Sequence, residues 1–287
     1  MFDCGALIHG WKPKIVFVSH THSDHVHFLT HIKDEQKPPL IYLPSEAETF
    51  VKAHLVAHQE MIECMTAIDI KEKNGGIDQE DYTLRATAPG EEIQFRQGGI
   101  DYIVRTLKMD HRIPCLGYSI FRLKSLLRKE YQGMSGREIG KLRKEGVQVT
   151  QHVEEPLLCF FGDTTSTVFD SYPELLSQHK VVIVECSFID EENLNRAETT
   201  KHMHWDHLEP KVAKHPDTFF ILIHFSLKYS SLSLREFFSR QQEKYNNIHP
   251  MLVEEEVEEQ WIRKNGASNK ADMPVCKCRI CKPIPIF

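Results

Sequence analysis

An α/β fold is predicted for this chain of 287 residues by three features of its sequence. Short apolar runs alternate with segments of helical period, as expected for strands that alternate with helices. Polar residues typical of metal sites follow several of these runs. The contents of apolar residues (41%) and charged residues (26%) are those of an ordinary globular protein, and the length suffices for one domain with a large core.

The elements can be placed in order along the chain. Strands are predicted at the seven short apolar runs, which span residues 14–18, 40–43, 100–107, 116–123, 157–161, 180–185 and 218–223. Helical spacing predicts helices at residues 45–65, within 125–145, and at 204–214 and 231–244. Ser45 and Glu48 have the spacing of a capping box at the start of the first helix.

The strongest motif follows the first predicted strand. The segment HTHSDH at residues 20–25 contains three imidazoles and one carboxylate. A short turn can aim His20 and His22 at one cation, and Asp24 and His25 at a second. Imidazole nitrogen and carboxylate oxygen are the ligands that zinc prefers. The motif therefore predicts a binuclear metal site, the alternative being polar residues on a solvated loop.

Further polar residues lie where other strand-like runs end. They are His111, Asp163, Glu185 and His224. Alpha/beta enzymes tend to place their chemistry in such loops. Each of these residues alone is more often structural, but the repeated pattern beside the motif at residues 20–25 favours a shared site.

Charge is distributed unevenly along the chain. The formal net charge is −6, but residues 122–144 carry +6 and leave −12 for the remainder. Two acidic residues oppose eight basic ones in this segment: Arg122, Lys124, Arg128, Lys129, Arg137, Lys141, Arg143 and Lys144. This asymmetry predicts a phosphate-binding arm on an acidic enzyme, and a solvated basic helical face is the alternative.

The termini and the cysteines indicate the compartment. No apolar segment approaches the roughly 20 residues that cross a bilayer, and the N-terminus resembles neither a signal nor a transit peptide. We therefore expect no membrane association, no secretion and a cytoplasmic or nuclear location, with reduced cysteines. Residues 264–287 lack periodicity and are expected to form a flexible tail. The tail contains Cys276, Cys278 and Cys281, too few thiols to close a tetrahedral metal site.

Further motifs accompany the segment at residues 20–25. They are FDCG at 2–5, HRIPCLGY at 111–118, GDTTS at 162–166, ECSF at 185–188, HMH at 202–204 and HFSLKY at 224–229. Over residues 2–251, the motifs together resemble the metallo-β-lactamase fold superfamily, and within it the short form of ribonuclease Z, the tRNA 3′-processing endonucleases. The motif at residues 20–25 alone marks only the superfamily. The segment KEYQGMSG at 129–136 resembles the short plant-type enzymes.

The resemblance implies a four-layer αββα fold and a catalytic domain at residues 1–263. Within it, residues 122–146 correspond to the family's tRNA-binding arm. Because residues 2–5 match a strand that other members place after further strands and a Pro-x-Lys-x-Arg-Asn loop, we expect an N-terminally truncated form of the fold. The residues implied to contact RNA are Lys124, Arg128, Lys129, Arg137, Lys141, Arg143 and Lys144.

The resemblance also implies two zinc ions per chain, although the same ligands accept manganese or iron. Two sets of three ligands are implied, with Asp163 bridging them: His20, His22 and His111 for one ion, and Asp24, His25 and His224 for the other. The ions would generate hydroxide and polarise the scissile phosphoryl group.

Asp24 is implied to orient or deprotonate the attacking water, and Glu185 with His202 to form the proton donor for the leaving group. His204 is the weaker candidate for the proton donor, because it lies 20 residues before His224. The family's spacing is 22 residues, which His202 has. His54 and His58 are expected to lie on a polar helix face.

The implied activity is a zinc-dependent cut in precursor tRNA after the discriminator base, by a homodimer. One alternative is a hydrolase of a small ester, thioester or lactam, which the sequence MDHR at residues 109–112 disfavours, since those branches carry Thr-Pro-Gly-His there. The other is a catalytically weak homologue that binds tRNA or metal.

Overall fold

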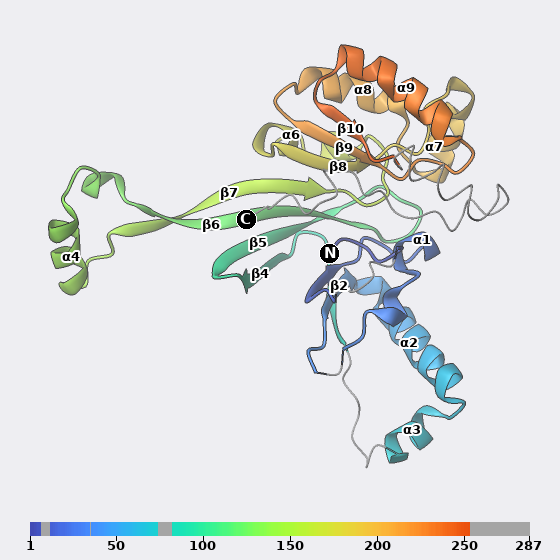
Figure 1. The fold of residues 1–287 in the computed structure, drawn as a ribbon, viewed down its shortest axis with the longest axis horizontal. Coiled ribbons are helices and arrows are strands. Elements are labelled where there is room, and N and C mark those ends of the chain that lie inside the picture. Colours follow the sequence, from blue (N-terminus) through green and yellow to red (C-terminus); the bar gives the residue numbers. More distant parts are fainter. Residues whose placement is uncertain (7–11, 35, 74–81, 253–287) are drawn as a thin grey trace.

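The structure is a computed structural model that describes residues 1–6, 12–34, 36–73 and 82–252. Two sheets form its centre, one of three strands in the order β1-β2-β3 and one of seven in the order β10-β9-β8-β7-β6-β5-β4. Helices α8 (Trp205–Lys214) and α9 (Ser231–Lys244) lie beside the larger sheet, and α2 (Glu48–Glu63) lies on the side of the smaller one (Figure 1).

The strands of the smaller sheet are parallel: β1 (Ile15–Phe17), β2 (Leu40–Pro44) and β3 (Thr83–Thr87). In the larger sheet, antiparallel pairs join β4 (Glu92–Gln97), β5 (Ile100–Lys108), β6 (Leu116–Leu127) and β7 (Thr150–Phe160). Parallel pairs then extend the sheet from β7 to β8 (Val181–Glu185), from β8 to β9 (Phe219–Ile223) and from β9 to β10 (Ile248–Pro250). The remaining α-helices are α1 (Ser23–Val26), α3 (Ala67–Lys73), α4 (Gly136–Lys144), α5 (Val168–Ser171), α6 (Leu175–Gln178) and α7 (Leu194–Thr200).

Three apolar cores separate the layers. Val16 and Leu43 of the smaller sheet pack with Leu55 of α2. Phe17 and Tyr118 lie in the core between the two sheets. The third core lies between the larger sheet and helices α8 and α9, and includes Phe220, Leu208 and Phe238. Three cores require four layers, so the predicted αββα architecture is confirmed.

Each predicted strand corresponds to a strand in the structure, but β3, β4 and β10 were not predicted. Strand β4 exposes most of its residues and β10 has three residues, so neither produces a clear apolar run. The predicted capping box is wrong, because Ser45 Oγ donates to Glu46 and lies in a 3₁₀ turn before α2. A capping box does form at the start of α4, between Ser135 and Glu138.

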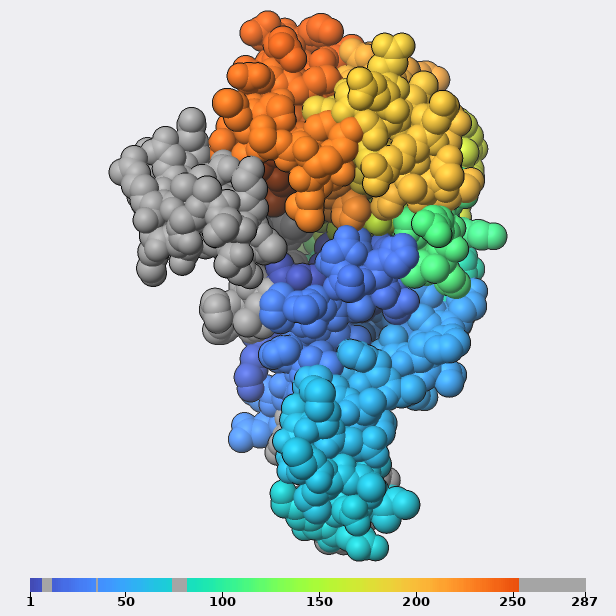
Figure 2. Space-filling model, turned by 90° about the vertical axis from the view of Figure 1, so that its right-hand side faces the viewer, coloured from blue at the N-terminus to red at the C-terminus, as the bar shows by residue number. Residues whose placement is uncertain are grey.

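Strands β6 and β7 continue beyond the sheet as a two-stranded hairpin. The hairpin carries α4 at its tip and projects from the rest of the molecule (Figure 1, left). We call residues 122–146 and the paired part of β7 the arm. The space-filling view shows that the N-terminal part of the chain (blue) and the yellow-to-orange part meet on one face (Figure 2).

Within the described ranges, no helix is both long and apolar enough to span a membrane. The predicted tail at residues 264–287, with Cys276, Cys278 and Cys281, lies outside the described residues.

Candidate metal centre

The predicted ligands come together at one edge of the two sheets. Residues 20–25 follow β1, His111 follows β5, Asp163 follows β7 and His224 follows β9. Parallel and antiparallel strands therefore deliver side chains from distant parts of the sequence to one place. His20 is fully buried and the Asp163 side chain is only 3% exposed.

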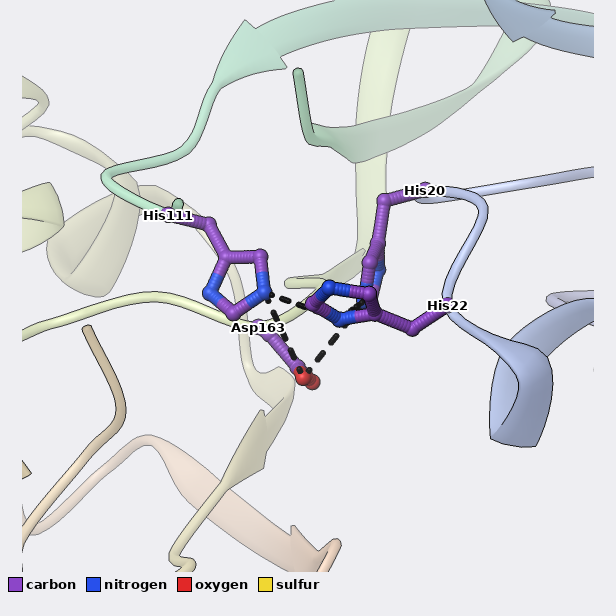
Figure 3. A group of neighbouring side chains, drawn as sticks. All are labelled: His20, His22, His111 and Asp163. Atoms are coloured by element: carbon purple, nitrogen blue, oxygen red, sulfur yellow. Dashed lines mark hydrogen bonds and ion pairs between the residues drawn. The ribbon is translucent and has the colours of Figure 1, made fainter. Parts of the chain in front are cut away.

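The first group consists of His20, His22, His111 and Asp163 (Figure 3). His22 Nδ1 lies 2.9 Å from His20 Nε2 and 3.2 Å from His111 Nε2. Asp163 Oδ2 is 3.6 Å from His20 Nε2 and 4.0 Å from His111 Nε2. One donor atom from each side chain lies within 4.8 Å of the others, so a single cation could contact all four.

The second group consists of Asp24, His25 and His224. Asp24 Oδ2 lies 3.1 Å from His224 Nε2 and 3.6 Å from His25 Nε2. Asp163 is close to this group too, with Oδ1 3.5 Å from His25 Nε2 and Oδ2 3.5 Å from His224 Nε2. The carboxylate of Asp163 therefore lies between the two groups, where a bridging ligand would be.

The imidazoles are oriented by partners on their far nitrogens. These partners are Ser19 Oγ for His20, Asp3 for His25, the Lys201 carbonyl for His111 and Ser187 Oγ for His224, at 2.8 to 3.0 Å. Such partners fix the ring orientation and the tautomer of a metal ligand. In each of the four cases Nε2 is left facing the centre.

Asp3 is the most connected of these partners. Its carboxylate accepts hydrogen bonds from Ser19 N at 2.6 Å, Ser19 Oγ at 2.8 Å and His25 Nδ1 at 2.8 Å. Gly5 lets the backbone of Asp24 pack against this segment, because a Cβ at residue 5 would lie 1.5 Å from the Asp24 carbonyl oxygen. The FDCG motif is therefore part of the candidate site, and Asp3 is a residue of the site that the motifs alone did not reveal.

Protonation differs between the two groups. Burial lowers the pKa of His20 to about 2 and also lowers the pKa values of His22 and His111. These rings are neutral near pH 7, as metal ligation requires. Burial disfavours charge on His25 as well, but the nearby Asp163 and the hydrogen bond to Asp3 outweigh it and raise the pKa to about 10.

The second group fits a cation on the chemistry of its donors. His25 Nε2 is buried and has no hydrogen-bond partner among the described residues. Buried polar atoms are rarely left unpartnered, and this one lies between two carboxylates. Burial disfavours charge on His224, but its hydrogen bond with Asp24 raises its pKa to about 9. A divalent cation bound here would replace these protons and engage the orphaned nitrogen.

Glu185 and His202 form a pair beside the two groups. His202 Nδ1 is 3.1 Å from both Glu185 oxygens. Glu185 is 1% exposed and also accepts hydrogen bonds from Thr164 N and Ser187 Oγ. Burial acts against charge on His202, but Glu185 outweighs it and raises the pKa of His202. His202 lines an open cavity of about 250 Å³ next to the metal groups.

The other candidate histidines lie elsewhere or serve structure. His204 is fully buried, donates from Nε2 to the Asp190 carbonyl, and accepts at Nδ1 from Asp206 N at the start of α8. His54 and His58 belong to no group of three or more metal-binding side chains in the part of the chain that the structure describes.

The basic residues of the arm have different surroundings. Lys124 and Arg122, at the base, both pair with Glu155 of β7. Arg128 approaches Glu130 at 3.8 Å, and Lys141 approaches Glu145 at 3.9 Å. Four basic residues form no ion pair within the described ranges: Lys129, Arg137, Arg143 and Lys144. The charge of +6 was summed over residues 122–144 and so did not include Glu155, which pairs with Arg122 and Lys124. The basic residues without an ion pair in the described structure therefore lie nearer the tip than predicted.

Comparison with known proteins agrees with the fold. No protein-family model matches the chain. It is 30% identical to tRNase Z TRZ1 of Arabidopsis thaliana over 237 residues, which are 80% of this chain and 79% of that protein. It is 28% identical to the chloroplastic tRNase Z TRZ2 of the same plant, covering 78% of this chain and 61% of that protein.

Among solved structures, the metallo-β-lactamase fold protein YhfI from Bacillus subtilis matches with a TM-score of 0.52 at 15% identity, covering 88% of this chain and 83% of that one. The protein thus falls in the class of metallo-β-lactamase fold proteins, and its two donor groups could hold divalent metal ions. Within this class the chain belongs to the tRNase Z family of endoribonucleases, which confirms the resemblance found in the sequence.

Proposed function

We propose that the protein is a zinc-dependent endoribonuclease that removes the 3′ trailer from precursor tRNA by hydrolysing the phosphodiester bond after the discriminator base. Membership of the tRNase Z family supports the substrate class. The observation that carries the proposal is the position of Asp163 within 4.0 Å of donor nitrogens in both ligand groups. A paired site of this kind suits phosphodiester hydrolysis.

Two zinc ions would be held by the side chains of the two groups. His20, His22 and His111 would hold one ion, Asp24, His25 and His224 the other, and Asp163 would contact both. When bound, the ions would lower the pKa of a bound water and polarise the scissile phosphoryl group.

Asp24 is the residue best placed to orient the attacking water or take its proton. Its side chain is 62% exposed, while Oδ2 stays 3.1 Å from His224 Nε2. This hydrogen bond lowers the pKa of Asp24, so the group is a carboxylate at neutral pH. A general base must be both ionised and accessible, and Asp24 satisfies both conditions.

His202 would give its proton to the leaving 3′-oxygen. Its raised pKa keeps the ring protonated longer as pH rises, and its position on the cavity lining gives access to substrate. Glu185 is too buried to touch RNA and acts through His202 as a positioning residue.

The arm would bind tRNA phosphates away from the cut. Its unpaired basic residues are exposed near the tip, far along the hairpin from the sheets (Figure 1). Contacts of this kind supply affinity without reading sequence. We further propose a homodimer in which one subunit's arm holds RNA for the partner subunit's site, which sedimentation equilibrium would test.

The first experiment is to incubate the purified chain with a precursor tRNA that carries a 3′ trailer, with and without a chelator, and to map the cut. A single cut after the discriminator base that leaves a 3′-hydroxyl, stops with chelator and returns with zinc is expected. An Asp163→Ala preparation made in parallel excludes a contaminating nuclease. No cut by a chain with two bound metal ions would overturn the proposal.

A further inference from the structure

The cavity beside the metal groups has a cationic wall that the proposed chemistry does not use. Its lining includes Arg112, Arg196, Phe188 and Thr200 together with His202. The two arginines come from different segments, Arg112 from the loop after β5 and Arg196 from α7. Both are exposed at the rim of the cavity.

Arg196 is held in place by an aromatic ring. Its guanidinium carbon lies 5.7 Å from the centroid of Phe188, within the range of a cation–π contact. Phe188 is 4% exposed, and its backbone pairs with the segment after His202 through Phe188 N to Met203 O and Trp205 N to Phe188 O. The same ring contacts His202 edge-on at 6.3 Å. Phe188 therefore links the position of Arg196 to that of the proposed proton donor.

The two arginines have no acidic side chain beside them on the cavity wall, because the described residues that line the cavity include no aspartate or glutamate. Neither Arg112 nor Arg196 forms an ion pair within the described part of the chain. Elsewhere the structure pairs arginines readily, as Arg105 does with Glu92 and Glu154. Exposed guanidinium groups beside a phosphodiester-cleaving centre are suited to bidentate contact with phosphate oxygens.

We propose that Arg112 and Arg196 bind the RNA phosphates on either side of the scissile phosphate and so place the chain across the metal centre. This inference rests on the proposed function. RNA carries one negative charge per nucleotide, so a strand that crosses the cavity brings neighbouring phosphates to its rim. The two arginines thereby select an extended nucleic-acid strand over a small phosphodiester.

We call Arg112 and Arg196 the clamp. Single variants Arg112→Gln and Arg196→Gln test it, with Arg240→Gln on α9 as the control. Arg240 is also exposed, but it is not among the residues lining the cavity. Each clamp variant is expected to lower kcat/KM for precursor tRNA about tenfold, as for loss of one charge-assisted contact. Each should also reduce the slope of log(kcat/KM) against log[salt] by ~0.7. Hydrolysis of bis(p-nitrophenyl) phosphate, which has no flanking phosphate, should stay within twofold of wild type.

A substrate series shows whether the contact is direct. Precursors with one methylphosphonate linkage immediately before or after the scissile bond lack the charge at that position. With wild type, each neutral linkage should reduce kcat/KM, whereas in each arginine variant one of the two should have no further effect. Arg196→Lys should recover part of the loss.

Additive losses with both linkages, or an equal loss on the small diester, would overturn the clamp and make the arginines structural. If wild type fails to cut precursor tRNA at all, the proposed function fails instead. If wild type cuts and both clamp variants match Arg240→Gln, the function stands and the clamp alone fails.

Discussion

The arm and the metal centre are both polar, but they are built in opposite ways. In the metal centre, His20 is fully buried, and four imidazoles have a hydrogen-bond partner on the far nitrogen. On the arm, Arg137, Arg143 and Lys144 are exposed and form no ion pair within the described ranges. Buried partners fix geometry, whereas exposed charges attract phosphate over a distance. The centre is therefore suited to chemistry, and the arm to affinity.

The largest expected effect follows from this division. Asp24→Ala removes an accessible carboxylate from the second ligand group. Turnover of precursor tRNA should fall by ~10³-fold, in the range for loss of a general base. Affinity for tRNA should stay within a few-fold of wild type, because the arm is untouched. Single-turnover kinetics and a filter-binding assay measure the two quantities separately.

Asp170→Ala is the matched control for this variant, since Asp170 pairs only with Lys211 at the surface of the described structure. It should leave both quantities near wild type. Unchanged turnover in Asp24→Ala would contradict the role given to Asp24. If Asp24→Ala lost tRNA affinity together with turnover, the metal centre would contribute to binding as well as to chemistry, and the two regions would not have separate roles.

The two regions also differ in how far the sequence could predict them. The grouping of the candidate ligands was predictable because residues 20–25 are contiguous and the others follow buried apolar runs, which mark strand ends. The residues that orient them were not, because His25 meets Asp3 across 22 positions, and His111 meets Lys201 across 90. The charge of the arm was overestimated for the same reason, since Glu155 lies across the hairpin from Arg122.

The second prediction concerns one of these unpredicted partners. Asp3→Asn keeps the size of the side chain but removes the charge that faces His25 Nδ1. Affinity for zinc should fall about 10- to 100-fold, the usual cost of losing the partner of a metal-bound histidine. Competition with a chromophoric chelator measures this change.

Asp101→Asn, at a surface ion pair with Arg96, is the control for Asp3→Asn and should bind zinc as wild type does. Equal zinc affinity in both variants would show that Asp3 supports the fold and not the centre. Neither change is expected to alter the affinity for tRNA.

A third prediction uses pH to test the pair beside the centre. Glu185 raises the pKa of His202, and the proposed donor must be protonated. Activity should therefore be present below this raised pKa and be lost as pH rises through it. Glu185→Gln should move the alkaline limb of the kcat profile to lower pH and reduce kcat near neutrality about tenfold.

Glu174→Gln is the control for the pH profile, because Glu174 lies before α6 and is not among the residues of the ligand groups. An alkaline limb that stays in place in Glu185→Gln would mean that another group donates the proton. The acid limb should be the same in wild type and both variants.

The smallest effect is expected on the arm, where contacts are many and separately replaceable. Arg143→Gln combined with Lys144→Gln removes two charges from the last turn of α4. The salt slope of tRNA affinity should fall by about 1.4 to 1.8, depending on whether single-stranded or duplex RNA is contacted, while KM rises only a few-fold at low salt. Hydrolysis of a small diester should not change, because the metal centre keeps all of its partners. Lys211→Gln on α8, outside the arm, should leave the slope unaltered. A loss of kcat on the small diester in the α4 variant would show instead that the arm and the centre are structurally coupled, and that exposed charge and buried geometry do not act as separate parts of this enzyme.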